Sequence, residues 1–231
     1  MRNAAGPKSM VAESTVSDEA RMSTLVAPTP EAGSKPAQIL EAAGALFLEN
    51  GYGAVSMDAV SKKANVSKAT LYAHFGSKDE LFRAMIACEC ASSALANVLE
   101  EARQLPVAEG LRMIGLKFAL FVTSPKALAM YRVILGEAHR FPELARAFHE
   151  SGPAITFTQV SGFLAEAVRK GELAIPDVEM ATHQFFGLVK ANLHMRFLLC
   201  LEDRPNREKM ERFIDSAVAL FVKGYAPPAA P

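Results

Sequence analysis

The sequence of 231 residues predicts an all-α protein. Apolar residues recur at helical spacing from Pro36 onward, and no stretch alternates apolar and polar residues as a half-buried strand would. Ser or Asp stands where several of these stretches begin, and Gly or Ser-Pro stands where several end, as helix caps require. Because 50% of the residues are hydrophobic, the helices can bury a sizeable core.

Composition argues against several classes of protein. The 25 basic residues equal the 25 acidic ones, so the chain as a whole lacks a basic excess. Three cysteines without framework spacing favour a reducing compartment, and Cys88 and Cys90, two residues apart, would point apart on a helix. The most apolar stretch, residues 185–201, contains charged residues that would be costly in a bilayer. We therefore expect a cytoplasmic protein with no metal, cofactor or membrane partner.

Three short helices are predicted near the N-terminus. The first spans Pro36–Asn50 before a glycine stop, and the second begins at Ser56. The third begins at Ser67, whose hydroxyl can accept a hydrogen bond from the backbone N–H three residues later. Val66 and Leu71 flank this start as a hydrophobic staple, which fixes the angle at which the chain enters the helix.

Longer helices are predicted over the rest of the chain. The capping box Ser77–Glu80 opens a fourth helix. Amphipathic stripes then predict helices around residues 111–123, 128–140, 142–171, 177–200 and 210–224. Residues 142–171 can form two helices or one kinked helix, because Pro142 and Pro153 both suit a first turn.

The third predicted helix has an exposed face of unusual shape. At about 100° per residue, Leu71 and Phe75 lie on one side of the helix, and Ala69 and Ala73 lie on the opposite side. Small residues at the centre of an exposed face let a helix approach base edges closely in a major groove. Thr70 lies on one flank of this face, within reach of donors and acceptors.

The charge around this helix is locally positive. Residues 59–78 contain four lysines and no acid, which gives a net charge of +4. Lys78 also stands at the start of the fourth helix, where free N–H groups and the helix dipole attract a phosphate. A solvated helical hairpin with ordinary surface lysines would give the same pattern, so charge and geometry alone leave both interpretations open.

Residues 36–87 strongly resemble the DNA-binding domain of TetR-family transcriptional regulators. The resemblance rests on "ILEAAGALFLENGY" and on "VSMDAVSKKANVSKATLYAHFGSKDELF", with its pattern T-L-Y-x-H-F-x-S-K-x-x-L. It implies a helix-turn-helix whose recognition helix enters the major groove of double-stranded DNA. The implied groove-facing residues are Lys68, Ala69, Thr70, Tyr72, Ala73 and His74. Ser56, Lys78 and Tyr72 would hold phosphates, and Ser67, which caps the recognition helix, completes the DNA-binding set.

The resemblance also implies a larger helical domain for ligand binding and dimerisation. "RVILGEAHRFPELARAF", residues 132–148, is similar to the AefR/AcrR-type branch. The expected divisions are a disordered tail, a DNA-binding domain, the larger domain and a C-terminal tail, at residues 1–34, 35–82, 83–225 and 226–231. The first tail has balanced charge, which favours a loose terminus over an arm that enters a DNA groove.

Two surfaces of the larger domain are expected to bind partners. Residues 185–201 are apolar on more than one helical face, which fits either a homodimer through the last two helices or a central helix buried in its own domain. A pocket would need aromatic walls with a few polar groups. The ligand-binding candidates are Phe118, Phe121, Phe157, Phe163, His183, Phe186 and Asn192. Each of these phenylalanines could equally fill the core.

The expected function is that of a homodimeric repressor that leaves a palindromic operator when a small hydrophobic ligand binds. An activator or a broad DNA-binding regulator could use the same module. An enzyme activity in the larger domain is the third alternative, but the sequence contains no G-x-S-x-G, P-loop or G-x-G-x-x-G motif and no catalytic residue is predicted.

Overall fold

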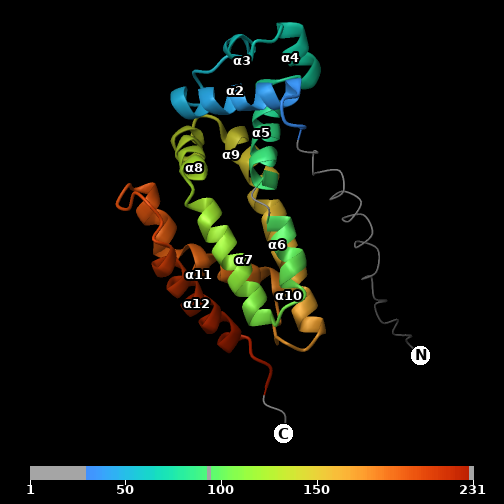
Figure 1. Ribbon diagram of the computed structural model, residues 1–231, viewed down its shortest axis with the longest axis vertical. Coiled ribbons are helices and arrows are strands. Elements are labelled where there is room, and N and C mark those ends of the chain that lie inside the picture. Colours follow the sequence, from blue (N-terminus) through green and yellow to red (C-terminus); the bar gives the residue numbers. More distant parts are fainter. Residues whose placement is uncertain (1–29, 93–94, 229–231) are drawn as a thin grey trace, which may run out of the picture.

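The computed structural model describes residues 30–92 and 95–228, and all regular elements in these ranges are α-helices (Figure 1). The first four helices are α2 (Lys35–Asn50), α3 (Met57–Lys63), α4 (Lys68–His74) and α5 (Lys78–Ser92). The others are α6 (Leu95–Ala102), α7 (Val107–Val122), α8 (Pro125–Glu137), α9 (Pro142–Ser151), α10 (Pro153–Arg169), α11 (Val178–Leu198) and α12 (Arg207–Gly224). The predicted all-α class is confirmed. Most of the predicted tail, residues 1–34, lies outside the described residues.

Serine side chains cap all of the first four helices, and three of these caps are at the predicted positions. The hydroxyl oxygens of Ser56, Ser67 and Ser77 each accept the backbone N–H three residues later, at 3.1, 3.0 and 3.1 Å. Each cap satisfies an N-terminal amide that the helix itself leaves without a partner. The starts of α3, α4 and α5 are therefore fixed by local sequence.

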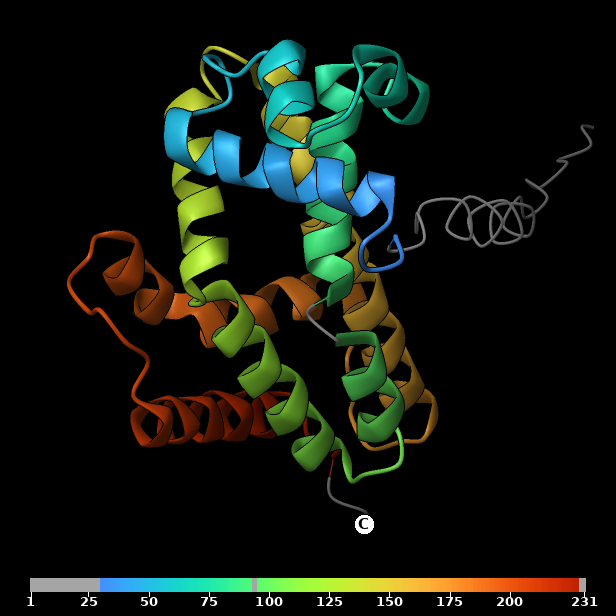
Figure 2. The same ribbon diagram turned by 45° about the horizontal axis from the view of Figure 1, so that its top comes forward.

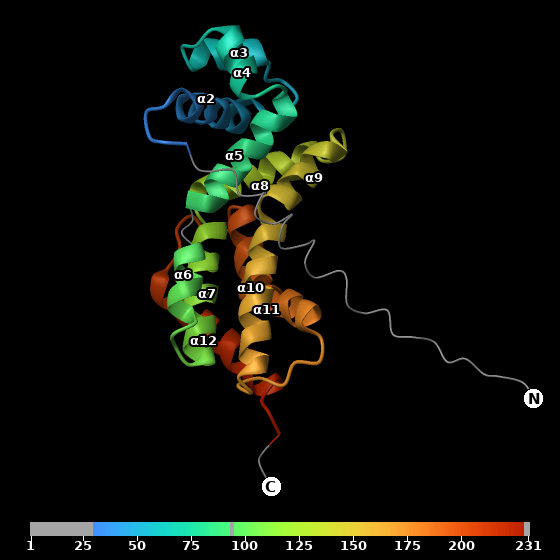
Figure 3. The same ribbon diagram turned by 90° about the vertical axis from the view of Figure 1, so that its right-hand side faces the viewer.

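Helices α2, α3 and α4 form a head at one end of the molecule, and the longer helices extend away from it (Figures 1 and 3). Helix α2 lies across the upper ends of α5 and α8 and contacts both (Figure 2). The core of the head continues into the neighbouring helices, since Leu71 and Phe82 are fully buried in the same cluster as Met130 and Leu144. The predicted domain limit at residues 82/83 falls within α5 and within this shared core.

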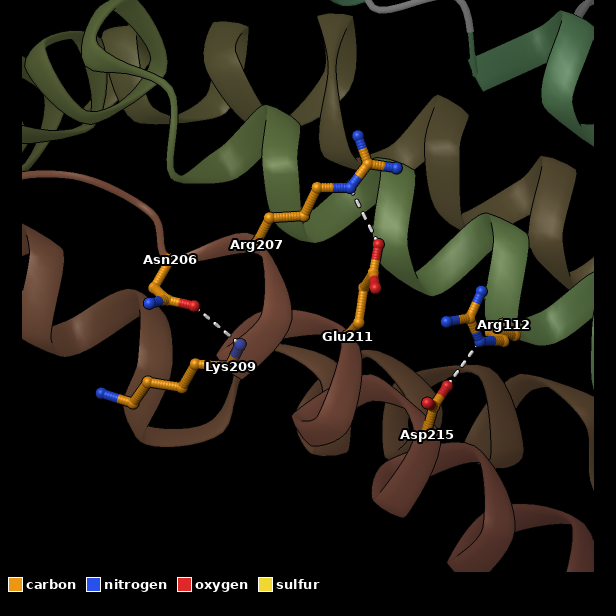
Figure 4. Close-up of polar contacts among 6 residues, drawn as sticks. All are labelled: Arg112, Asn206, Arg207, Lys209, Glu211 and Asp215. Carbon is orange, nitrogen blue, oxygen red and sulfur yellow. Dashed lines mark hydrogen bonds and ion pairs between the residues drawn. The ribbon is translucent and has the colours of Figure 1, made fainter.

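A second core fills the opposite end of the molecule, between α6, α7, α10, α11 and α12. Its fully buried members include Leu111, Ile114, Leu164, Phe185 and Ile214. At its surface, Arg112 Nε of α7 lies 2.5 Å from Asp215 Oδ1 of α12, and Figure 4 shows this pair beside the first turns of α12.

Three features of the helices outside the head could not be predicted from the sequence. Helices α9 and α10 are separate and meet at Gly152, which decides between the two alternatives for this stretch. Helix α6 was not predicted as a separate element. Helix α11 is broken at Ala191, whose φ of 28° and ψ of −135° are not helical.

No single helix in the described ranges is long and apolar enough to span a membrane. Helices α7 and α8 together reach the required length and composition, but they are bent by 65° relative to each other.

Candidate nucleic-acid interface and cavity

Helices α3 and α4 are joined by a tight turn. The N–H of Val66 donates to Ser61 O at 3.0 Å, and Asn65 adopts a positive φ of 51°, which asparagine tolerates better than most residues. Behind the turn, Leu71 and Phe75 are 0% and 9% exposed and anchor α4 to the head. Helix α4 is therefore held at a fixed angle to α3, as a helix-turn-helix requires.

The outer face of α4 has the shape that the sequence predicted. Lys68, Ala69, Tyr72 and Ala73 are exposed, and Tyr72 retains 49% exposure. Thr70 is half-buried, and its hydroxyl lies 2.8 Å from the hydroxyl of Ser67. Ser67 therefore caps α4 and forms a hydrogen bond with the Thr70 side chain. The small side chains of Ala69 and Ala73 leave the centre of the face open.

His74 is placed differently from the other candidates. It is exposed at the last turn of α4, and it lines a small hollow with Leu40 of α2 and with Ala84 and Cys88 of α5. His74 therefore borders the contact between α4, α2 and α5 as well as the solvent.

Two of the candidate lysines have neighbours within the head. Lys68 Nζ lies 2.5 Å from Asp58 Oδ2, across the turn between α3 and α4. Asp58 stands directly before the acid-free stretch 59–78. Its carboxylate neutralises part of the positive charge of Lys68, so the net charge of this region is lower than the +4 of residues 59–78. Lys78 Nζ lies 4.2 Å from the ring centroid of Tyr52, and burial lowers the pKa of Lys78. Ser56 is exposed at the start of α3, where its hydroxyl caps the helix.

A cavity of about 540 Å³ lies between α5, α7, α8, α9, α10 and α11. Its wall includes five of the predicted ligand-binding residues, Phe118, Phe121, Phe157, His183 and Phe186. Three of the rings form a continuous surface, since Phe186 lies 4.5 Å from Phe118 and 4.6 Å from Phe157 between ring centroids. The ring of His183 lies 4.5 Å from that of Phe157.

Two predicted members do not line this cavity, and their grouping with the others is corrected. Phe163 is 4% exposed and packs in the core of the larger part, because it faces away from the cavity on α10. Asn192 is exposed, because the break at Ala191 turns the chain directly before it.

The prediction missed a polar group of the cavity wall, which consists of Tyr131, Lys190 and His194. Lys190 Nζ lies 5.3 Å from the ring centroid of Tyr131, and the ring of His194 lies 5.0 Å from the same centroid. Burial, and then the charge of Lys190, lowers the pKa of His194 to about 4. The sequence carries no usable signal for this group, because Tyr131 lies on another helix and the break at Ala191 separates Lys190 from His194.

The helices around the cavity also hold the head. Helix α5 contributes Ile86 to the cavity and packs against α2 of the head. Helix α8 contributes Tyr131, and at its end Glu137 Oε1 accepts the N–H of Gly53 at 3.3 Å, in the loop between α2 and α3. Helices α5 and α8 therefore contact both the cavity and the head.

A helix-turn-helix head joined to a larger helical domain defines a DNA-binding protein. The profile described as "Bacterial regulatory proteins, tetR family" matches residues 39–85. The profile described as "AefR-like transcriptional repressor, C-terminal domain" matches residues 109–227. The chain belongs to the TetR family of bacterial transcriptional regulators, with a C-terminal domain of the AefR-like type.

Relatives cover both parts of the chain. The transcriptional regulator UidR of Escherichia coli K12 is 32% identical over 155 residues, which cover 65% of this chain and 74% of UidR. The solved structure of the "Flavonoid-responsive Regulator FrrA" is 39% identical, with a TM-score of 0.70 over 86% of this chain and 100% of FrrA. A TetR-family regulator from Mesorhizobium loti shares the fold, with 24% identity and a TM-score of 0.74 over 85% of this chain and 99% of that one.

Proposed function

We propose that the protein is a repressor that binds a palindromic operator as a homodimer and is released when a small hydrophobic ligand occupies the cavity. The observation that carries this proposal is that α5 and α8 both line the cavity and both contact the head. FrrA, which is similar over most of this chain, is named as flavonoid-responsive, and this supports a small-molecule effector here. The protein would act in the cytoplasm, where its operator lies.

In the proposed complex, the outer face of α4 enters the major groove. Lys68, Ala69, Thr70, Tyr72 and Ala73 would meet base edges, with the alanines giving close approach. Tyr72 would also contact the phosphate backbone.

The phosphate contacts would flank this helix at both ends. Ser56 and Lys78 stand at the starts of α3 and α5, where free backbone N–H groups favour an anion. His74, exposed at the last turn of α4, would lie at the edge of the same groove.

The proposed homodimer uses the outer faces of α11 and α12. Met195, Leu199 and Leu220 are 50%, 61% and 60% exposed there, although large apolar side chains are usually buried. Burying these side chains against a partner subunit would remove apolar surface from water. Sedimentation of the protein should give a dimer, and Leu220→Glu should shift it toward the monomer.

Footprinting on the DNA upstream of the protein's own gene tests the function as a whole. A repressor should protect a short palindrome that overlaps a promoter and should reduce transcription from it in a purified system. Increased transcription would favour an activator, and protection without sequence preference would favour a broad DNA-binding regulator. Turnover of a bound small molecule would favour an enzyme activity.

A further inference from the structure

We propose that the effector is a planar aromatic molecule that carries an acidic group, and that Lys190 binds this group. This inference rests on the proposed function, because it concerns the ligand of the same cavity. It assigns to Lys190 the role of a specificity-determining residue.

The walls of the cavity favour aromatic rings. Phe118 and Phe157 flank Phe186, at centroid distances of 4.5 and 4.6 Å, and the three rings form one surface. Tyr131 faces the cavity from α8, with Phe148 at a centroid distance of 5.8 Å. Aromatic rings attract further rings through offset or edge-on contacts, beyond the burial of area alone. The volume of about 540 Å³ falls within the range of small-molecule sites.

The charges in the cavity wall favour an anion. Lys190 and Glu89 both line the cavity, and Glu89 forms an ion pair with Lys126 at its rim. Among the described residues, no acidic side chain forms an ion pair with Lys190, which contacts the ring of Tyr131. A cation in a mostly apolar site gains from a counter-ion, because the site solvates it poorly.

A neutral hydrogen-bonding group, His194, lies beside this cation. His194 is 5% exposed and lies against Tyr131 on the same side of the cavity as Lys190. Burial keeps its imidazole uncharged at neutral pH, so it can donate one hydrogen bond without adding a second positive charge. The acidic group of the effector would therefore meet one cation and one neutral donor.

The backbone beside Lys190 is strained. Ala191 lines the cavity with a φ of 28°, where an alanine is rarely found, and it breaks α11 directly after Lys190. Strained residues of this kind persist where the surrounding structure holds them, and they are concentrated at ligand sites. This places the break in α11 at the point where the acidic group would bind.

Three probes test the assignment with the full-length protein near neutral pH. They are 2-naphthoate, its neutral counterpart 2-naphthamide, and the aliphatic anion decanoate. Calorimetry should give at least tenfold tighter binding for 2-naphthoate than for either other probe. Equal binding of the acid and the amide, tighter binding of decanoate, or binding of none of the three would overturn the assignment.

Two substitutions separate charge from packing. Lys190→Met keeps an unbranched side chain and should abolish the preference for 2-naphthoate over 2-naphthamide, whereas Lys190→Arg should retain it. Thermal unfolding of both variants checks that the fold is intact. A preference that survives in a folded Lys190→Met variant would overturn the role of Lys190.

Operator binding distinguishes this inference from the function on which it rests. If 2-naphthamide binds as tightly as the acid and releases the operator, the repressor function stands and the anionic effector is wrong. If 2-naphthoate binds through Lys190 and operator affinity does not change, the effector class stands and the repressor function is wrong.

Discussion

Replacing Gly51 with alanine should loosen the contact between the head and α8. Gly51 follows α2 with φ 79° and ψ 163°, a conformation that is almost restricted to glycine, so alanine should cost about 1–3 kcal/mol. Its added Cβ would lie 2.8 Å from Glu137 Oε1. The carboxylate would have to move away from the N–H of Gly53, and losing that hydrogen bond should cost a further 0.5–1.5 kcal/mol, roughly.

Chemical unfolding at one fixed protein concentration measures this cost. The matched control is Gly171→Ala, because Gly171 also has a positive φ, 74°, but an added Cβ there would meet no atom within 4 Å. Gly51→Ala should therefore destabilise the protein by more than the control does. Glu137→Ala in the Gly51→Ala background should remove the part of this excess that comes from the contact with the carboxylate, as a double-mutant cycle would detect.

Two results would contradict this expectation: Gly51→Ala costs no more than Gly171→Ala, or Glu137→Ala leaves the whole excess in place. Either result would mean that the carboxylate of Glu137 moves without loss and does not hold the loop between α2 and α3.

Three further predictions concern the head and the cavity. Lys78→Ala should weaken binding to all DNA sequences and lower the slope of log affinity against log salt concentration by about one unit. Thr70→Ala should instead cost about 1–3 kcal/mol of binding free energy at the operator alone. Fluorescence anisotropy with operator and with random DNA measures both effects. Asp58→Asn should release Lys68 and strengthen binding to random DNA in the same assay, and unchanged affinity would mean that the ion pair does not compete with phosphate. His194 has a pKa of about 4 in the folded protein, below its usual value, so the unfolded chain takes up the proton first. The free energy of unfolding should therefore fall by about 1–3 kcal/mol as the pH is lowered from about 6.5 to 4. The His194→Gln variant should lack this part of the pH dependence.

The head could be predicted almost completely from the sequence, because its structure is set locally. Ser56, Ser67 and Ser77 cap helices with N–H groups only three residues away. Such contacts are encoded in short stretches of chain, as are the apolar positions that bury one face of α4. The Asp58–Lys68 pair was missed because it joins two helices across their turn.

The cavity could be predicted only in part, because its wall combines side chains from helices distant in the sequence. An aromatic residue on an apolar helical face can fill the core, as Phe163 does, or line a cavity, as Phe157 does. Only packing between helices decides which. The break at Ala191 carries no glycine or proline, so local sequence gives no sign of it.

The central claim is that occupation of the cavity lowers operator affinity. The most direct measurement is the affinity of the protein for its operator at fixed salt, with and without a small molecule that binds in the cavity. The ligand should weaken operator binding by about 5–150-fold, and the operator should weaken ligand binding by the same factor, because coupling between two sites is reciprocal. A cavity ligand that leaves operator affinity unchanged would contradict this claim.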